Sequence, residues 1–326
     1  MLKFIGKRLL ALIPIMLGVM VIIFCIRAIT PGDPVDMLFP DTATEEERME
    51  MREELGLTDS LPVQFVKYVA DVVRGDLGTS YITKQPVMQE ILQRMPTTMA
   101  VCFGAVFLGI ILGVPLGILS AQYPYSIIDS IILVVSMIAR AIPGFCLAFL
   151  FITVFSVELH WLPSFGISTP AGYILPMLTI GLGSIANYTR LTRSSMLEVV
   201  RQDYIRTARA KGQTEGKIIF GHALRNASIP IVASIGNQVG HQLGGALIIE
   251  TVFGIPGIGK YIGDAMSARN FPAIQGGVLT LALIFTVVNL LVDLSFTVIN
   301  PRLKTGIISG GSRKKSTAPK KAAANA

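Results

Sequence analysis

The sequence contains few charged residues, and this scarcity argues against most classes of water-soluble protein. Lys, Arg, Asp and Glu together make up 15% of the 326 residues, whereas a soluble domain carries about 25%. Histidine and cysteine, the usual metal ligands, occur only three times each. Hydrophobic residues account for 52% of the chain, so the composition predicts a protein that lies largely within a lipid bilayer.

The rare histidines and cysteines do not form a recognisable catalytic or metal site. The cysteines each lie within an apolar run and lack a CxxC pair, so we expect them to pack as small hydrophobic residues. His160, His222 and His241 are predicted outside the membrane, inside the cell and within a span. The chain is therefore not expected to be an enzyme, and no cofactor or metal is expected to bind to it.

One segment approaches a nucleotide-binding motif without completing it. Residues 254–261 read GIPGIGKY, which matches the G-x4-G-K part of a phosphate-binding loop. Tyr261 stands where a Ser or Thr hydroxyl should reach magnesium, and the segment follows a predicted membrane helix rather than a strand. We interpret it as a Gly-Pro turn at the membrane surface.

Six apolar runs are long enough to form membrane-spanning helices, since a span needs about 20 residues. The third run is the least regular: it could start as early as residue 127, Pro143 can break it, and Arg140 must lie near water or protein. The first run is too long for a secretion signal and no small-x-small site follows it, so we expect a retained span. The predicted spans are residues 9–29, 97–119, 131–157, 173–191, 229–251 and 276–299.

The distribution of basic residues predicts the orientation. Residues 3–8 contain three Lys or Arg, residues 190–228 contain eight and the tail from 302 to 321 contains seven. With six spans these segments lie on one side, which the positive-inside rule assigns to the cytoplasm. We expect a multi-pass protein of a bacterial or archaeal cytoplasmic membrane, in contact with lipid rather than nucleic acid, with both termini cytoplasmic.

The chain is expected to have three regions: residues 1–96, 97–304 and 305–326. The first combines one span with an acidic extracytoplasmic segment, in which Thr44 and Glu47 have capping-box spacing and short amphipathic helices are predicted. The second is a five-helix core, and the third is a low-complexity basic cytoplasmic tail that is expected to be disordered.

Two spans carry glycines at four-residue intervals. Such ridges allow close approach of helix backbones, and they predict either tight packing or a surface on which helices slide. The ridges are Gly109, Gly113 and Gly117 in the second span, and Gly236, Gly240 and Gly244 in the fifth.

The fifth span also carries four polar residues near its middle: Asn237, Gln238, His241 and Gln242. Polar groups at this depth must find partners or face a water-filled cavity. The pattern therefore leaves two interpretations, hydrogen bonding between helices or the lining of a solute path.

The basic segment 193–228 has helical propensity and contains no proline. Tyr204, Ala208 and Gly212 are spaced one helical turn apart, which predicts a face for close approach to a partner, flanked by basic side chains. A loop that only met water would not need such a face.

At this point the sequence resembles the permeases of ATP-binding-cassette (ABC) importers of the dipeptide, oligopeptide and nickel family. The resemblance covers nearly the whole chain except the tail. It rests on TRSSMLEVVRQDYIRTARAKG (192–212), HALRNASIP (222–230), ETVFGIPGIG (250–259), QGGVL (275–279), NLLVDL (289–294) and NPR (300–302), with RLLALIP, PGDPV and GDLGTS nearer the N-terminus.

The resemblance implies a type I ABC importer fold, with a coupling helix near residues 200–226 that docks on an ATPase subunit. In the family this loop carries an EAA-x3-G motif; here Gly212 fits the glycine, but Arg206 replaces the glutamate. The implied partners are a homologous second permease, two ATPase subunits that bind ATP and Mg, and an extracytoplasmic solute-binding protein. The implied docking residues are Tyr204, Arg206, Thr207, Ala208, Ala210 and Gly212.

The expected function is therefore a permease subunit that forms a path for dipeptides or oligopeptides. Glutathione and chelated nickel are alternative solutes, although the absence of a His or Cys cluster disfavours bare metal. A secondary transporter or channel would need inverted repeats and intramembrane ionisable residues, and a membrane enzyme would need a cluster of reactive side chains. The sequence shows no such repeat, only isolated charges within the spans, and no cluster of reactive side chains.

Overall fold

The computed structural model describes residues 2–30, 35, 44–54 and 56–299, and these residues form helices joined by loops. The predicted all-α fold is confirmed, since the described part contains one isolated β-bridge and no longer strand. The tail for which disorder was predicted, residues 305–326, lies outside the described residues.

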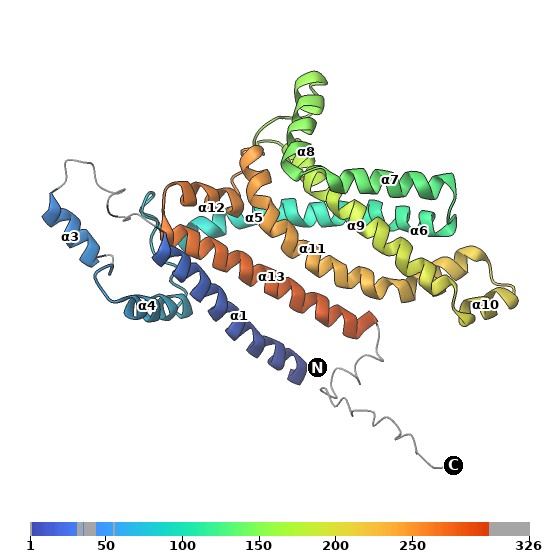
Figure 1. The fold of residues 1–326 in the computed structure, drawn as a ribbon, viewed down its shortest axis with the longest axis horizontal. Helices are drawn as coiled ribbons and strands as arrows, with labels where there is room; N and C mark the ends of the chain where they lie inside the picture. Colours follow the sequence, from blue (N-terminus) through green and yellow to red (C-terminus); the bar gives the residue numbers. More distant parts are fainter. Residues whose placement is uncertain (1, 31–34, 36–43, 55, 300–326) are drawn as a thin grey trace, which may run out of the picture.

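The long helices form one elongated bundle (Figure 1). Helix α1 (Leu2–Ile29) packs against α13 (Phe271–Ile299), and α13 packs against α11 (Leu224–Val252). Helix α11 in turn contacts α5 (Val87–Leu108). The start of α1 and the end of α13 point towards the end of the bundle that carries α10 (Asp203–Ala210).

The opposite end of the bundle carries three short helices, α3 (Glu45–Glu54), α4 (Leu61–Val73) and α12 (Ile258–Ser267) (Figure 1). The capping box predicted at the start of α3 is present. The Thr44 backbone N–H donates to Glu47 Oε2 over 2.9 Å, and the Glu47 N–H donates to Thr44 Oγ1 over 3.3 Å.

The third predicted span is not one straight helix. Helix α7 (Ile127–Ala141) is followed by Ile142, whose backbone is extended, and the chain bends by 100° before α8 (Gly144–Phe151) and the π-helical η2 (Ile152–Glu158). Proline disfavours the helical conformation of the residue before it, so Pro143 accounts for the bend. Helix α8 consequently projects from the bundle (Figure 1).

Four helices of the described residues are long and apolar enough to cross a membrane, or five if α7 and α8–η2 count as one span. The sequence predicted six. The difference lies in α9 (Ile174–Val200), which contains all but the first residue of the predicted span 173–191 but is not among them. Helix α9 packs against α5, α7, α8 and α11 and buries several hydroxyl side chains. A helix surrounded by protein needs less apolar surface than one facing lipid.

All three glycines of the first ridge and two of the three in the second pack closely against another helix. Helix α5 continues through the π-helical η1 (Gly109–Gly113) into α6 (Val114–Gln122), and its three ridge glycines lie against α9. Gly236 and Gly240 lie against α13. Gly244 is different, because no other atom would lie within 4 Å of an added Cβ there.

A Gly117→Ala variant is expected to lower the melting temperature of the detergent-solubilised protein. The new Cβ would lie 2.6 Å from the Thr189 carbonyl oxygen and 2.6 Å from Thr192 Cβ, so α6 and α9 must separate. Overpacking of this kind costs about 1–3 kcal/mol. Gly244→Ala is the matched control and should leave the melting temperature unchanged or slightly higher. Equal melting temperatures for the two variants would contradict this account of the ridge.

Candidate docking helix and candidate solute cavity

The short helix α10 stands at one end of the bundle and is fixed to it by two side chains. Ile205 is fully buried and Ala208 is 9% exposed. Both pack in a hydrophobic cluster with Met196 of α9 and with Ile218 and Ile219 of the π-helical η4 (Lys217–Ala223). This buried side holds α10 in a defined orientation and leaves its other side open.

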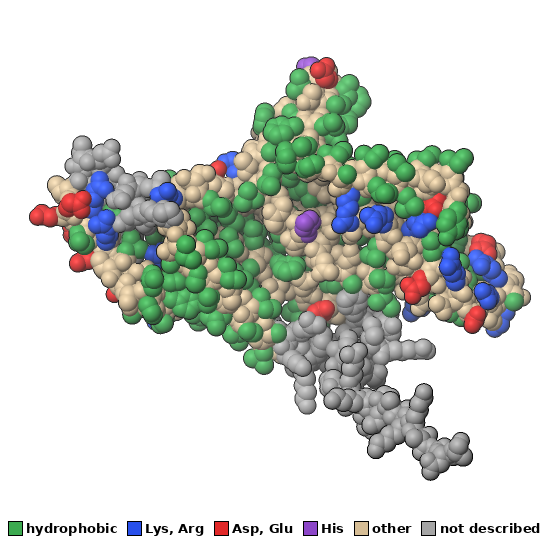
Figure 2. Space-filling view, in the orientation of Figure 1, with side chains coloured by type: hydrophobic (Ala, Val, Ile, Leu, Met, Phe, Trp, Pro, Cys, Tyr) green, Lys and Arg blue, Asp and Glu red, His purple; other side chains and the backbone are tan. Residues whose placement is uncertain are grey.

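The open side of α10 is polar and includes several predicted docking residues. Tyr204 is 43% exposed, and its hydroxyl accepts a hydrogen bond of 2.9 Å from Asn226 Nδ2. Arg206 lies 3.7 Å from Asp203, and both side chains are largely exposed. Thr207 and Ala210 are exposed as well. Figure 2 shows basic side chains gathered at this end of the molecule.

The predicted face of Tyr204, Ala208 and Gly212 does not exist. Ala208 faces the protein while Tyr204 is exposed, and Gly212 lies beyond the end of α10. Gly212 has φ +76°, its N–H donates to Arg209 O, and the Gln213 N–H donates to Ala208 O. These are the two bonds of a Schellman motif with glycine at C′. Gly212 therefore ends the helix rather than forming part of its face.

An exposed ion pair closes the turn that follows. Arg209 Nε donates to Glu215 Oε1 over 2.7 Å, and a terminal nitrogen of Arg209 donates to Glu215 Oε2 over 3.1 Å. This hydrogen-bonded guanidinium lowers the pKa of the Glu215 carboxyl below its usual value. The pair connects α10 to the start of the next helical segment.

A second ion pair, much less exposed, lies between α7 and α9 towards the same end. Arg193 Nε and a terminal nitrogen each donate to the Asp129 carboxylate over 2.7 Å. Asp129 also accepts from the Ser120 hydroxyl and from the Tyr125 backbone N–H. The sequence assigned Arg193 only to membrane topology, whereas the structure shows that it joins the first turn of α7 to α9.

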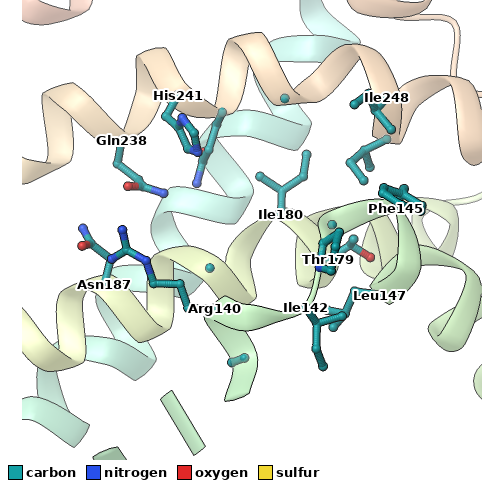
Figure 3. A pocket seen from close by; sticks show the side chains of 17 residues that line it. Arg140, Ile142, Phe145, Leu147, Thr179, Ile180, Asn187, Gln238, His241 and Ile248 are labelled. Atoms are coloured by element: carbon teal, nitrogen blue, oxygen red, sulfur yellow. The ribbon is translucent and has the colours of Figure 1, made fainter. Parts of the chain in front are cut away.

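Polar residues of α11 line a cavity of about 530 Å³ between α7, α8, α9 and α11 (Figure 3). Gln238, His241 and Gln242, three of the four residues predicted for a solute path, line it. Asn237 is exposed but is not among the lining residues. Thr179 and other residues of α9 form the facing wall.

Two of these residues also bond between helices, so the two sequence interpretations are compatible. Gln238 Nε2 and Gln242 Nε2 donate to Ser184 Oγ of α9 over 3.0 and 2.6 Å. Gln242 Oε1 is buried, and among the described residues it has no hydrogen-bond partner. The hydrogen bonds fix both amide side chains at the cavity wall.

Sequence reasoning did not place Arg140 or Asn187 at this site, although both line the cavity. Arg140 belongs to the last turn of α7, and Asn187 Nδ2 donates to Ser234 Oγ over 3.0 Å. The sequence did contain one signal for Arg140, which lies within an apolar run three residues before a proline. This pattern indicates that the helix breaks at a place where the arginine meets water or protein.

The glycine-rich segment that approached a phosphate-binding motif surrounds a carboxylate of the chain itself. The Glu250 side chain is fully buried, and its oxygens accept from the Thr98 hydroxyl over 2.7 Å and from the Lys260 N–H over 2.9 Å. An added Cβ at Gly257 or Gly259 would collide with this carboxylate. Tyr261 donates to Glu90 over 2.7 Å. The segment is therefore a structural turn at the start of α12.

No group of three or more His, Cys, Asp and Glu residues that could hold a metal ion is present among the described residues. The polar atoms of the cavity wall come instead from amides, an imidazole, a hydroxyl and a guanidinium. Such groups can hydrogen-bond an organic solute, and they do not form the oxygen or sulfur cage typical of a metal site.

Two family models match the sequence. Residues 113–305 match the binding-protein-dependent transport system inner membrane component, and residues 1–102 match the N-terminal region of the same kind of membrane component. Together the two matches include most of the chain, with α10 and the cavity helices inside the first of them.

Curated relatives match nearly the full length of the chain. The chain is 40% identical over 304 residues to the glutathione transport system permease protein of Pectobacterium atrosepticum, covering 93% of this chain and 99% of the relative. It is 39% identical over 332 residues to the dipeptide transport system permease protein of Alkalihalophilus pseudofirmus, covering 93% and 100%.

A solved structure of a methionine ABC transporter in an inward-facing conformation has a similar fold. The TM-score is 0.56 at 19% sequence identity, and the match covers 65% of this chain and 97% of the solved chain. At this identity the likeness supports the arrangement of the helices alone.

Proposed function

We propose a solute, a path and a set of contacts for this chain, which belongs to the family of binding-protein-dependent transport system inner membrane components. It is a multi-pass, helical permease subunit of an ABC importer in the inner membrane, and ATP hydrolysis belongs to separate subunits. The proposed solutes are dipeptides and oligopeptides. The proposed orientation places both termini and α10 in the cytoplasm.

The observation that carries this proposal is the way α10 packs against the end of the bundle. A buried side of Ile205 and Ala208 fixes the helix at the end of the bundle, and the exposed side chains of Tyr204, Arg206 and Thr207 can contact a partner. A rigidly held helix can transmit a push to the bundle, whereas a mobile loop would absorb it. We therefore assign α10 and the turn at Gly212 as the contact with one ATPase subunit.

The cavity between α7, α8, α9 and α11 is the proposed part of the solute path in this chain. It lies between helices of the core, and two of its amide side chains, Gln238 and Gln242, are held by hydrogen bonds to α9. A homologous second permease would close its open side, and a solute-binding protein would deliver solute at the end that carries α3, α4 and α12 (Figure 1).

Peptides are favoured as the solute by the names of the relatives, one of which is a probable peptide ABC transporter permease protein of Sinorhizobium fredii, 38% identical over 309 residues. The glutathione and dipeptide relatives are 40% and 39% identical, so identity does not separate these solutes. Glutathione is itself a modified tripeptide, and chelated nickel remains a third alternative within the same class of transporter.

The proposal is tested by uptake of a labelled dipeptide into proteoliposomes that contain the complete transporter with its binding protein. Uptake should require ATP and stop when this chain is reconstituted alone, with or without an ion gradient. A Gln242→Leu variant should reduce uptake about tenfold, because it removes an amide that bonds to α9 and faces the cavity. Leu291→Ala, on the exposed side of α13, is the control and should transport normally.

Two results would contradict the proposal. Gradient-driven uptake by the chain alone would identify a secondary transporter, which needs no ATPase. ATP-dependent uptake that is unchanged in Gln242→Leu would leave the importer intact and would place the solute path elsewhere.

A further inference from the structure

The side chain of Arg140 is placed in the cavity by the break between α7 and α8. It belongs to the last turn of α7, two residues before the extended Ile142 and three before Pro143. A continuous helix through this region would have carried Arg140 within an apolar stretch. Instead α7 ends one residue after Arg140, and the chain bends by 100° beside the cavity (Figure 3).

The charge of Arg140 is not balanced within the described residues. No ion pair or hydrogen bond of its side chain is found there, and the cavity lining contains no Asp or Glu. A guanidinium within a membrane-spanning region is costly unless it meets water or an anion. The cavity is therefore a largely apolar space with a few polar groups and one uncompensated positive charge.

The groups around Arg140 complete a small-molecule site. Asn187 lines the same part of the cavity, and Gln238 lies across from it on α11 (Figure 3). Gln242 is 3% exposed, and its Oε1 is an acceptor without a partner among the described residues. The cavity of about 530 Å³ falls within the size range of small-molecule sites, about 300–1,000 Å³.

We propose that Arg140 binds the carboxylate of the transported solute in this cavity, with Gln242 Oε1 accepting a hydrogen bond from an N–H group of the same molecule. A guanidinium forms paired, charge-assisted hydrogen bonds with a carboxylate. This inference rests on the proposed function and adds the chemical feature that the path recognises, namely a free carboxylate, which peptides and glutathione share.

A role of Arg140 in structure alone predicts a different outcome. A basic residue in the last turn can stabilise the helix end through its dipole, and an acidic residue of a second permease could pair with Arg140. Either role would affect all solutes equally. A carboxylate site instead predicts that loss of Arg140 affects acids and not the corresponding amides.

The test compares uptake of a labelled dipeptide with uptake of its C-terminally amidated form by the complete transporter in proteoliposomes. Arg140→Gln should lower uptake of the free acid at least about tenfold relative to the amide. Arg140→Lys should give an acid-to-amide uptake ratio between those of Arg140→Gln and the unaltered transporter. The binding protein is the same in every sample, so its own preference cancels in this ratio. Arg190→Gln is the matched control, since Arg190 is exposed on α9 outside the cavity.

An equal loss of acid and amide uptake in Arg140→Gln would overturn the carboxylate site while leaving the importer assignment intact. If the unaltered transporter takes up neither dipeptide, the proposed peptide solute is wrong, and the same variants are compared with glutathione and its diester. A selective loss of glutathione uptake would then support the Arg140 site. Uptake of none of the four solutes would overturn both proposals.

Discussion

A Gly212→Val variant is expected to reach the membrane in normal amounts and to lose ATP-driven uptake about tenfold or more. Gly212 has φ +76°, a conformation that costs an L-residue about 1–2 kcal/mol and a β-branched residue more. The Schellman bonds at the end of α10 depend on this conformation. The turn should rearrange and change the orientation of α10, while the buried helices keep their contacts.

Two control variants separate backbone strain from size. Gly212→Asn should retain most of the uptake, because asparagine tolerates the left-handed conformation better than other residues with a side chain. Gly216→Val should also retain it, since Gly216 has helical φ and ψ and open space around it. Membrane insertion is measured by fractionation, and coupling by ATPase activity and uptake in the complete transporter. Normal ATP-driven uptake by the Gly212→Val variant would contradict the proposal that transport requires a fixed orientation of α10.

A Glu250→Ala variant is expected to destabilise the protein more than any other single change described above. Removal of this buried carboxylate leaves the Thr98 hydroxyl and the Lys260 N–H without their acceptor, and it creates a cavity beside Gly257 and Gly259. An unsatisfied buried group costs about 1–3 kcal/mol, and loss of the buried side-chain atoms adds about 1–2 kcal/mol. The sum predicts a large fall in melting temperature in detergent.

A series of replacements at Glu250 tests whether its hydrogen bonds are responsible for the stabilisation. Glu250→Gln keeps one acceptor oxygen and most of the volume, so its melting temperature should lie between those of the unaltered protein and Glu250→Ala. Glu158→Ala removes an exposed acid at the end of η2, and it should leave the melting temperature unchanged. A Glu250→Ala protein as stable as the unaltered one would show that the turn at the start of α12 does not depend on this carboxylate.

Helix α10 illustrates how much local sequence patterns can predict. A basic, proline-free segment between apolar runs correctly predicted a helix outside the apolar core, because helix propensity and charge are local properties. The prediction of its face was wrong because it extended the helix through Gly212. A glycine can continue a helix or end it, and the choice depends on whether the following residues find hydrogen-bond partners.

The spans illustrate the same limit for the fold. Apolar length located the helices of the bundle, and the positions of Arg140 and Pro143 in the sequence indicated that the third run is irregular. Hydropathy could not show that α9 is surrounded by other helices. A hydroxyl-rich helix is stable in the middle of a bundle because its neighbours replace lipid, and those neighbours are up to about a hundred residues away in the chain.

The sequence by itself determined that this protein is helical, lies in a membrane and presents a basic helix outside its apolar core, since these properties follow from composition and short-range periodicity. Only the tertiary structure decided which polar residues share a space. The 100° bend after Arg140 brings that guanidinium to the same cavity as Gln238 and Gln242, and Glu250 reaches the amides of α12. Such sites depend on contacts between helices, which residue spacing along one helix does not encode.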